Sequence, residues 1–331
     1  MASGCQQFPP QTQERQPGKE HAMEPVPQAT SEEYKPANKA SNPLSLSLSL
    51  SLSLSLSLSL SLTHTHTHTP RLVTIGMVFC AQGKVALVTG GDSGIGRAVC
   101  YCFALEGATV AFTYVKSQED EDANDTLQMP RQNKRSNAKE PIASPADLGY
   151  EENCRKVVEE VMNTYGCIDI LVNNAAEQYV RPLITEQQLQ RVFRTNIFSY
   201  FFVSKFVVKY MKAGGSIINT TSVNAYKGNA KLLDYTSTKG AIVAFTRALA
   251  LQLVERWIRV NGVASGPVWT PLIPASFPQG QVVNFGKQVP MGRPGQPIEI
   301  APSFVFLAAT PDSSFITGQV IRLNGGTVVN G

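Results

Sequence analysis

A tyrosine and a lysine that stand four residues apart could transfer a proton. Tyr235 and Lys239 lie in the segment YTSTK. Residues with this spacing project from one face of a helix, so the Lys239 ammonium would lie close to the Tyr235 hydroxyl. A neighbouring cation favours the phenolate and lowers the tyrosine pKa from about 10 toward the range of a general base. Such pairs are also common on solvated helices, so this one predicts catalysis only if a cofactor and a pocket accompany it.

The positions of the histidines exclude several kinds of histidine-based site. All four, at positions 21, 64, 66 and 68, precede residue 83, after which the sequence contains none. A Ser-His-Asp triad and a zinc site built on HExxH are therefore excluded from residues 83–331, and we expect no metal site. Proton transfer must use another group, which favours Tyr235.

A glycine-rich segment, TGGDSGIG at residues 89–96, follows an apolar run and precedes a helical pattern. Gly90, Gly94 and Gly96 would let the backbone turn tightly and approach a pyrophosphate, while the helix N-terminus supplies amide donors. Placement between a strand and a helix is the context that a dinucleotide-binding loop requires. The segment therefore predicts dinucleotide binding.

The elements that must position these residues alternate along the chain. Expected strands span 84–90, 108–114, 142–148, 168–176, 216–222, 258–264 and 318–326, and expected helices span 94–107, 150–166, 187–211, the segment around Tyr235, and 297–309. The polar segment between 114 and 142 is expected to be a connection. Alternating strands and helices predict an α/β fold with a doubly wound parallel sheet of Rossmann type, formed by one domain over residues 83–331.

The first 82 residues are expected to be a disordered, low-complexity extension. Residues 1–43 are rich in Gln, Pro, Glu, Lys and Ser and lack apolar periodicity. Ser and Leu then alternate over 44–62, and Thr and His over 63–69. The serines make the first tract too polar for a membrane span. Because CT and CA dinucleotide repeats encode these two alternations, we hypothesise that residues 40–82 are a translated intron or a gene-model error.

Composition limits the partners and the location. The net charge of +4 over 331 residues is too small and scattered to predict nucleic-acid binding. The six cysteines show no paired spacing, and neither end of the sequence carries a recognised address. We therefore expect a cytoplasmic protein that binds neither nucleic acid nor membrane.

Five motifs occur in order: TGxxxGxG at 89–96, NNAA at 173–176, Asn196, Ser222 and YxxxK at 235–239. Together they resemble the short-chain dehydrogenase/reductase family over essentially all of residues 83–331. Within that family, segments such as TGGDSGIGRAVCYC and RVFRTNIFSYFF are similar to the glucose and ribitol dehydrogenase homologues of plants.

The resemblance implies an NAD(P)-dependent oxidoreductase that interconverts a secondary alcohol, such as a sugar or polyol, and its carbonyl. Tyr235 would be the general acid/base, and Lys239 would lower its pKa and bind the cofactor ribose. Ser222 would bind the reacting oxygen. Asn196 would hold a helix kink and a water that relays protons to Lys239; a helix-helix hydrogen bond is its alternative role. The alternative function is that of a dinucleotide-binding sensor or scaffold without turnover.

The resemblance also implies the cofactor contacts. Two positions depart from the family pattern, since Ala176 replaces a glycine and Ser265 a proline. The choice between NAD and NADP stays open, because Tyr114 is neither acid nor base, Lys116 favours NADP and Asp92 disfavours it. The implied cofactor-binding residues are Gly90, Asp92, Ser93, Gly94, Ile95, Gly96, Tyr114, Asp147, Leu148, Asn174, Ala175, Tyr235, Lys239, Pro267, Val268 and Thr270.

The same resemblance implies partners for the catalytic domain. A small-molecule alcohol or carbonyl is the expected substrate, and residues 267–294, with Trp269, Phe277 and Phe285, are expected to cover it. The long apolar helix at 187–212 is of the kind that packs against a symmetry mate in this family, so a homo-oligomer, dimer or tetramer, is expected.

Overall fold

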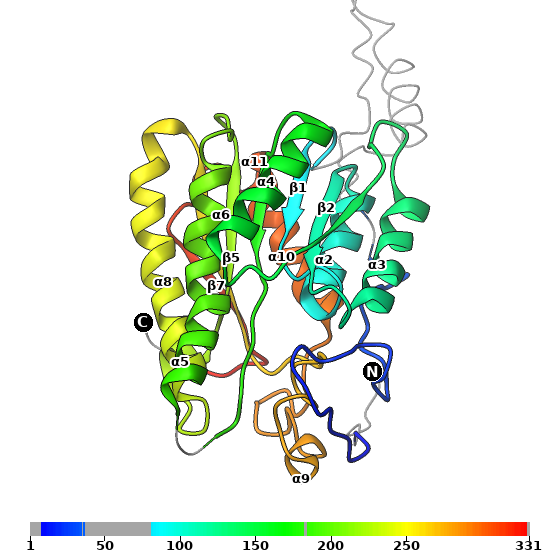
Figure 1. Ribbon diagram of the computed structural model, residues 1–331, viewed down its shortest axis with the longest axis vertical. Coiled ribbons are helices and arrows are strands. Elements are labelled where there is room, and N and C mark those ends of the chain that lie inside the picture. Colours follow the sequence, from blue (N-terminus) through cyan, green and yellow to red (C-terminus); the bar gives the residue numbers. More distant parts are fainter. Residues whose placement is uncertain (1–7, 35, 37–80, 182–183, 330–331) are drawn as a thin grey trace, which may run out of the picture.

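The computed structural model describes residues 8–34, 36, 81–181 and 184–329 (Figure 1). A seven-stranded parallel sheet has the order β3-β2-β1-β4-β5-β6-β7. The strands are β1 (Val85–Val88), β2 (Thr109–Tyr114), β3 (Ile142–Pro145), β4 (Ile170–Asn173), β5 (Ser216–Ser222), β6 (Arg259–Ser265) and β7 (Val320–Leu323). The predicted doubly wound Rossmann-type sheet is confirmed.

Helices cover both faces of the sheet (Figure 1). They are α2 (Gly94–Leu105), α3 (Asp120–Asn133), α4 (Glu151–Tyr165), α5 (Glu186–Phe193), a π-helix (Arg194–Phe198), α6 (Ser199–Val207), α7 (Asn224–Lys227), α8 (Leu233–Leu253), a 3-10 turn (Val254–Arg256), α9 (Gln279–Val282), α10 (Pro297–Ala308) and α11 (Thr310–Ser313). None of the helices in the described ranges is long and apolar enough to cross a bilayer.

Strand alternation distributes the core between the two faces. In β1, Val85 and Leu87 join an apolar cluster that includes residues of α4, α6 and α8. Ala86 and Val88 point to the opposite face and join the cluster formed with α2 and α10. Because successive side chains of a strand alternate between faces, a run of apolar residues is the pattern of a strand buried on both sides.

The strand order creates a crevice at one edge of the sheet. β1 pairs with β2 on one side and with β4 on the other. The chain therefore adds β2 and β3 on one side of β1 and then crosses over to add β4 on the other side. In such sheets the ligand site lies beyond the carboxyl ends of the strands where the order reverses. The fold therefore places the residues after Val88, Asn173 and Ser222 at one site.

Two details of the helices differ from the prediction. The segment expected as a polar connection contains α3, whose inward side is partly polar: Asp122 and Thr126 are buried and hydrogen-bond to Arg97 of α2. Because this face packs through polar pairs, apolar periodicity could not reveal it. The helix expected over 187–211 is interrupted by the π-helix Arg194–Phe198.

The N-terminal strap, which we define as residues 8–34, belongs to the extension that is predicted to be disordered. It forms no helix or strand, in keeping with its Gln- and Pro-rich composition, yet several of its side chains contact the domain. Phe8, Glu20 and Met23 are buried against the domain. The strap lies beside the loop that carries α9 (Figure 1).

The described part of the chain resumes at residue 81, just before the predicted start of the domain at residue 83. Ala81 is buried in the core, and its amide donates to the carbonyl of Glu106. The Ser-Leu and Thr-His tracts lie outside the described residues, so the intron hypothesis for residues 40–82 stays a prediction.

Candidate active site

One cavity of about 540 Å³ follows the carboxyl edge of the sheet. Among the sixteen residues predicted to bind the cofactor, all but Gly96 line this cavity. Ser222 lines it too, whereas Asn196 does not. The structure thus brings the glycine loop, the residues after β3 and β4, and the Ser-Tyr-Lys group to one continuous space.

The glycine loop is fixed to the end of β4. Asn174 donates its side-chain amide to the carbonyls of Thr89 (3.2 Å) and Gly90 (3.0 Å), and its backbone amide donates to Thr89 Oγ1 (2.8 Å). Gly90 has φ +62°, a conformation that favours glycine. A Cβ there would lie 3.0 Å from Ala175 Cα. These contacts form a cradle that fits a pyrophosphate at the N-terminus of α2.

Gly96 serves the loop from outside the cavity. A Cβ on Gly96 would lie 1.9 Å from the carbonyl oxygen of Gly90, so only glycine lets α2 approach the loop. We expect Gly96→Ala to weaken NADPH binding at least about tenfold, because the loop must shift. Gly240→Ala, at a helical position with open space around the added methyl, is the control. Equal dissociation constants for both variants in isothermal titration would contradict this role.

Ser222, Tyr235 and Lys239 come from the end of β5 and the first turns of α8. The Ser222 side chain lies close enough to Tyr235 to lower its pKa. Lys239 Nζ donates to the carbonyl of Thr220 (3.0 Å) and lies 5.3 Å from the centroid of the Tyr235 ring. The i, i+4 spacing therefore places the amine beside the phenol, as the sequence predicts.

Burial, rather than the proximity of the two groups, determines the pKa values of Tyr235 and Lys239. It raises the pKa of Tyr235 to about 12, against a smaller lowering by the Ser222 side chain. It lowers the pKa of Lys239 to about 7. The sequence predicted that the lysine lowers the tyrosine pKa, and this is wrong for the structure: desolvation dominates, because both side chains are almost fully removed from water. Near neutral pH the tyrosine is a protonated phenol and the lysine exchanges between its two forms.

Asn196 lies in the π-helix and is fully buried. Its Oδ1 accepts from the amide of Glu177 (2.8 Å), and its Nδ2 donates to the carbonyl of Glu177 (2.8 Å) and to Thr238 Oγ1 (3.2 Å). This π-helix lies at the position where the resemblance implies a helix kink. The side chain connects the segment after β4 to α8, so it positions the walls of the cavity without lining it.

We expect Asn196→Ala to lower the free energy of unfolding by about 2–4 kcal/mol, because it leaves two buried backbone groups of Glu177 without partners. Chemical denaturation measures this change. Asn163→Ala, which removes an exposed amide from α4, should change stability by about 0.5 kcal/mol or less. Equal effects of the two substitutions would show that the Asn196 contacts do not stabilise the fold.

The cavity contains two acidic groups, of which the glycine-loop motif reveals Asp92 but not Glu119. Asp92 and Glu119 line it, and burial raises the pKa of both. Lys116, which the sequence suggested as an attraction for NADP, is exposed and lies outside the cavity lining. Asp147 pairs with Arg191 Nη1 (2.6 Å), and the Nε atom of the same arginine donates to Glu177 Oε1. Nothing in the spacing of Glu119 or Arg191 would have identified them.

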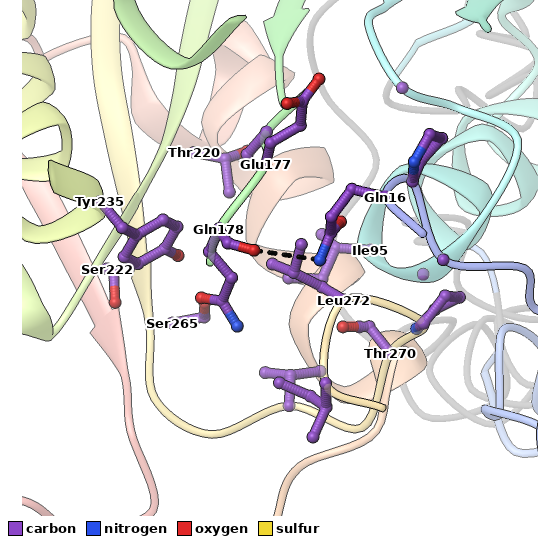
Figure 2. Close-up of a pocket in the computed structure, with 18 of the residues that line it drawn as sticks. Gln16, Ile95, Glu177, Gln178, Thr220, Ser222, Tyr235, Ser265, Thr270 and Leu272 are labelled. Carbon is purple, nitrogen blue, oxygen red and sulfur yellow. Dashed lines mark hydrogen bonds between the residues drawn. The ribbon is translucent and has the colours of Figure 1, made fainter. Parts of the chain in front are cut away.

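Gln178 is a second residue that the sequence did not single out. It is buried, and Figure 2 shows its side chain in the cavity with Tyr235, Ser222 and Ser265. Its backbone carbonyl accepts from Gln16 Nε2 (3.0 Å). It follows NNAA by two residues, but an amide at that position carries no recognisable pattern of its own.

Two of the three aromatic residues in the loop that is expected to cover the substrate line the cavity. Phe277 and Phe285 line the cavity, whereas Trp269 is fully buried outside it. The Trp269 ring stacks on Phe8 with 3.8 Å between centroids, and its Nε1 donates to the carbonyl of Pro25 (2.7 Å). Trp269 therefore anchors the N-terminal strap to the loop.

The fold and the cavity define a Rossmann-type dinucleotide-binding protein, and the comparisons agree. A family profile described as Enoyl-(Acyl carrier protein) reductase matches residues 90–328. The chain is 60% identical to the glucose and ribitol dehydrogenase homolog of Oryza sativa subsp. japonica over the full length of both. It is 59% identical to the NADPH-dependent aldehyde reductase 1, chloroplastic, of Arabidopsis thaliana, over 97% of this chain and 98% of that protein.

A solved structure gives the same picture. The short-chain dehydrogenase of Burkholderia cenocepacia J2315, in complex with NADP, has a TM-score of 0.67 at 30% identity and covers 74% of this chain and 98% of its own. The chain therefore belongs to the short-chain dehydrogenase/reductase family. It is an NAD(P)-dependent enzyme of that family, and the predicted similarity to the plant glucose and ribitol dehydrogenase homologues is confirmed.

Proposed function

We propose that this enzyme interconverts a secondary alcohol, such as a sugar or polyol, and its carbonyl, with Tyr235 as general acid/base. The observation that carries the proposal is that Ser222, Tyr235 and Lys239 line the same cavity as the glycine loop. A bound nicotinamide cofactor would supply or accept the hydride. The chain must then supply the proton that accompanies it, and Tyr235 has the only ionisable hydroxyl of the three.

The environment of Tyr235 suits proton donation to a carbonyl oxygen. Burial holds its pKa near 12, so the phenol is protonated at neutral pH and ready for the reductive direction. In that direction the Ser222 hydroxyl would donate to the same oxygen as negative charge develops on it. The charged form of Lys239, beside the ring, would stabilise the phenolate that remains. In the oxidative direction the same groups act in reverse, and Tyr235 takes the proton.

The polar lining supports a hydroxyl-rich substrate. Amide side chains both donate and accept hydrogen bonds, which suits the hydroxyls of a sugar or polyol. The names of two relatives, glucose and ribitol dehydrogenases, point the same way. The amides that line the cavity away from the glycine loop are Gln178, Asn224, Asn229, Gln281, Asn284 and Gln288.

A substrate panel tests this proposal. The full chain would be assayed for NADH or NADPH formation with sugars, polyols and steroids, and for NADPH consumption with the matching aldehydes and ketones. We expect turnover with polyhydroxylated substrates. Cofactor binding without turnover of any compound in either direction would favour the sensor or scaffold function instead.

The assembly and the location are also proposals. Leu189, Phe198 and Phe201 are 41%, 41% and 52% exposed along α5, the π-helix and α6, which supports a homo-oligomer, dimer or tetramer, formed through these helices. Light scattering of the purified chain would give its mass. We keep the cytoplasm as the proposed location, although one relative is named chloroplastic; imaging of a fluorescent fusion decides between the two.

A further inference from the structure

The N-terminal strap forms part of the wall of the cofactor cavity. Gln16, Pro17 and Gly18 line the same cavity as the glycine loop and Tyr235. Figure 2 shows Gln16 reaching across the cavity to the carbonyl of Gln178. Because these three residues lie more than 70 positions before the glycine loop, the family profile, which begins at residue 90, does not include them.

One attachment of the strap is at the glycine loop itself. Glu20 is fully buried, and its Oε2 accepts from the backbone amide of Gly94 while its Oε1 pairs with Arg97 Nη1 (2.8 Å). The carboxylate of Asp122, on α3, accepts from the backbone amides of Glu20 (2.8 Å) and His21 (3.0 Å). Charged hydrogen bonds removed from water hold the strap here against α2 and α3.

A second attachment is at the loop after β6. A Cβ on Gly18 would lie 2.2 Å from the carbonyl oxygen of Pro271, so the two backbones touch. Gln16 Nε2 also donates to Ser276 Oγ (2.9 Å), and the amide of Gln13 donates to the carbonyl of Pro274 (2.8 Å). Hydrogen bonds and a close backbone contact therefore attach the strap to this loop.

Apolar contacts secure the outer parts of the strap. Phe8 and Met23 pack in one cluster with Trp269, Ile273 and Val282. Burying a large apolar side chain contributes on the order of 1.5–3 kcal/mol, so Phe8 and Met23 each add to the stability of the attached strap.

From these contacts we propose that the strap retains the bound dinucleotide, with Glu20 as its latch. The strap contacts both the glycine loop and the loop after β6, and its residues line the cavity between these two attachments. A dinucleotide lying along the glycine loop would therefore be enclosed, and its release requires the strap to separate from Gly94 or from Pro271. Binding and release should be slowed together, and the population of opened strap should set the release rate.

The opposite role is the main alternative. A carboxylate at a helix N-terminus occupies a position that also attracts phosphate, so Glu20 could compete with the cofactor pyrophosphate. The two roles predict opposite effects of removing Glu20 on the affinity for the cofactor. Removal of a latch speeds release, whereas removal of a competitor tightens binding.

The test measures cofactor release from the full chain in the absence of any substrate. The protein is loaded with NADPH, and separately with NADH, and mixed in a stopped-flow instrument with excess oxidised cofactor, while the fluorescence of the reduced cofactor is followed. The variants are Glu20→Ala, which removes the latch, and Gly18→Ala, which pushes the strap from Pro271 without changing charge. Glu14→Ala, which removes an exposed carboxylate from the same strap, is the matched control.

We expect release to be roughly ten- to hundredfold faster in Glu20→Ala and in Gly18→Ala, with the control within about twofold of the parent. Hydrogen exchange of residues 8–34 should accelerate in the same two variants. Release within twofold of the parent in both variants overturns the proposal, and slower release with tighter binding in Glu20→Ala overturns it in favour of competition. Because no substrate is turned over, failure of the Tyr235 mechanism would not alter these results.

Discussion

Tyr235→Phe is expected to lower kcat roughly 10²–10⁴-fold while leaving cofactor binding within about twofold of the parent. The substitution removes one oxygen and keeps the ring, so the packing of this buried side chain is preserved. What is lost is the group that exchanges a proton with the reacting oxygen. The loss should appear in kcat in both reaction directions, since one residue serves as acid and as base.

Tyr210→Phe is the matched control, because Tyr210 is 44% exposed and is not among the residues that line the cavity. Its kcat should equal that of the parent. If Tyr235→Phe turns over a substrate as fast as the parent does, with the fold intact by circular dichroism, then the tyrosine has no role in the mechanism.

Lys239→Met should change activity and stability in opposite directions. We expect activity to fall by about 100-fold or more, because the charge beside the Tyr235 phenolate is gone. We also expect the free energy of unfolding at pH 7 to rise by about 1–3 kcal/mol, since burying this amine is unfavourable in the folded state. The lost hydrogen bond to the Thr220 carbonyl offsets part of the gain.

The effect of Lys239 on the free energy of unfolding depends on pH. The pKa of Lys239 falls from 10.5 in the unfolded chain to about 7 in the fold. Between these values the unfolded state binds more protons, so this lysine makes stability rise with pH. Its destabilising effect is complete below about pH 7 and absent above 10.5. The stability difference between Lys239→Met and the parent should therefore shrink from pH 7 to pH 9.

Urea denaturation at several pH values measures this difference, with Lys209→Met, at an exposed position, as the control. A stability difference that is flat with pH, or a variant less stable than the parent at pH 7, would show that the amine is already well accommodated in the fold.

Local patterns were enough to predict the central features of the site. The glycine loop, Ser222 and the Tyr235–Lys239 pair each depend on a strand end or on helical spacing, and parallel strands bring such ends to one edge. Sequence spacing could also place the amine beside the phenol. It could not give the pKa of either group, because burial depends on what the remainder of the chain packs around them.

The features that the sequence did not predict depend on contacts between distant residues. Glu20 meets Gly94 across 74 positions and Arg97 through a buried ion pair, so a Gln- and Pro-rich segment that carries no apolar periodicity still packs onto the domain. The same holds for α3, whose inner face is polar. Gln178 enters the site from the irregular segment after β4, which no local pattern of side chains records.

A crystal structure of the full chain with the oxidised cofactor and a bound polyol tests the central claim most directly. We predict that the reacting hydroxyl of the polyol lies about 2.6–3.2 Å from the Tyr235 oxygen and that its carbon faces the nicotinamide ring at about 3–3.5 Å. A ring bound away from Tyr235, or a substrate oxygen held by another ionisable group, would contradict the account.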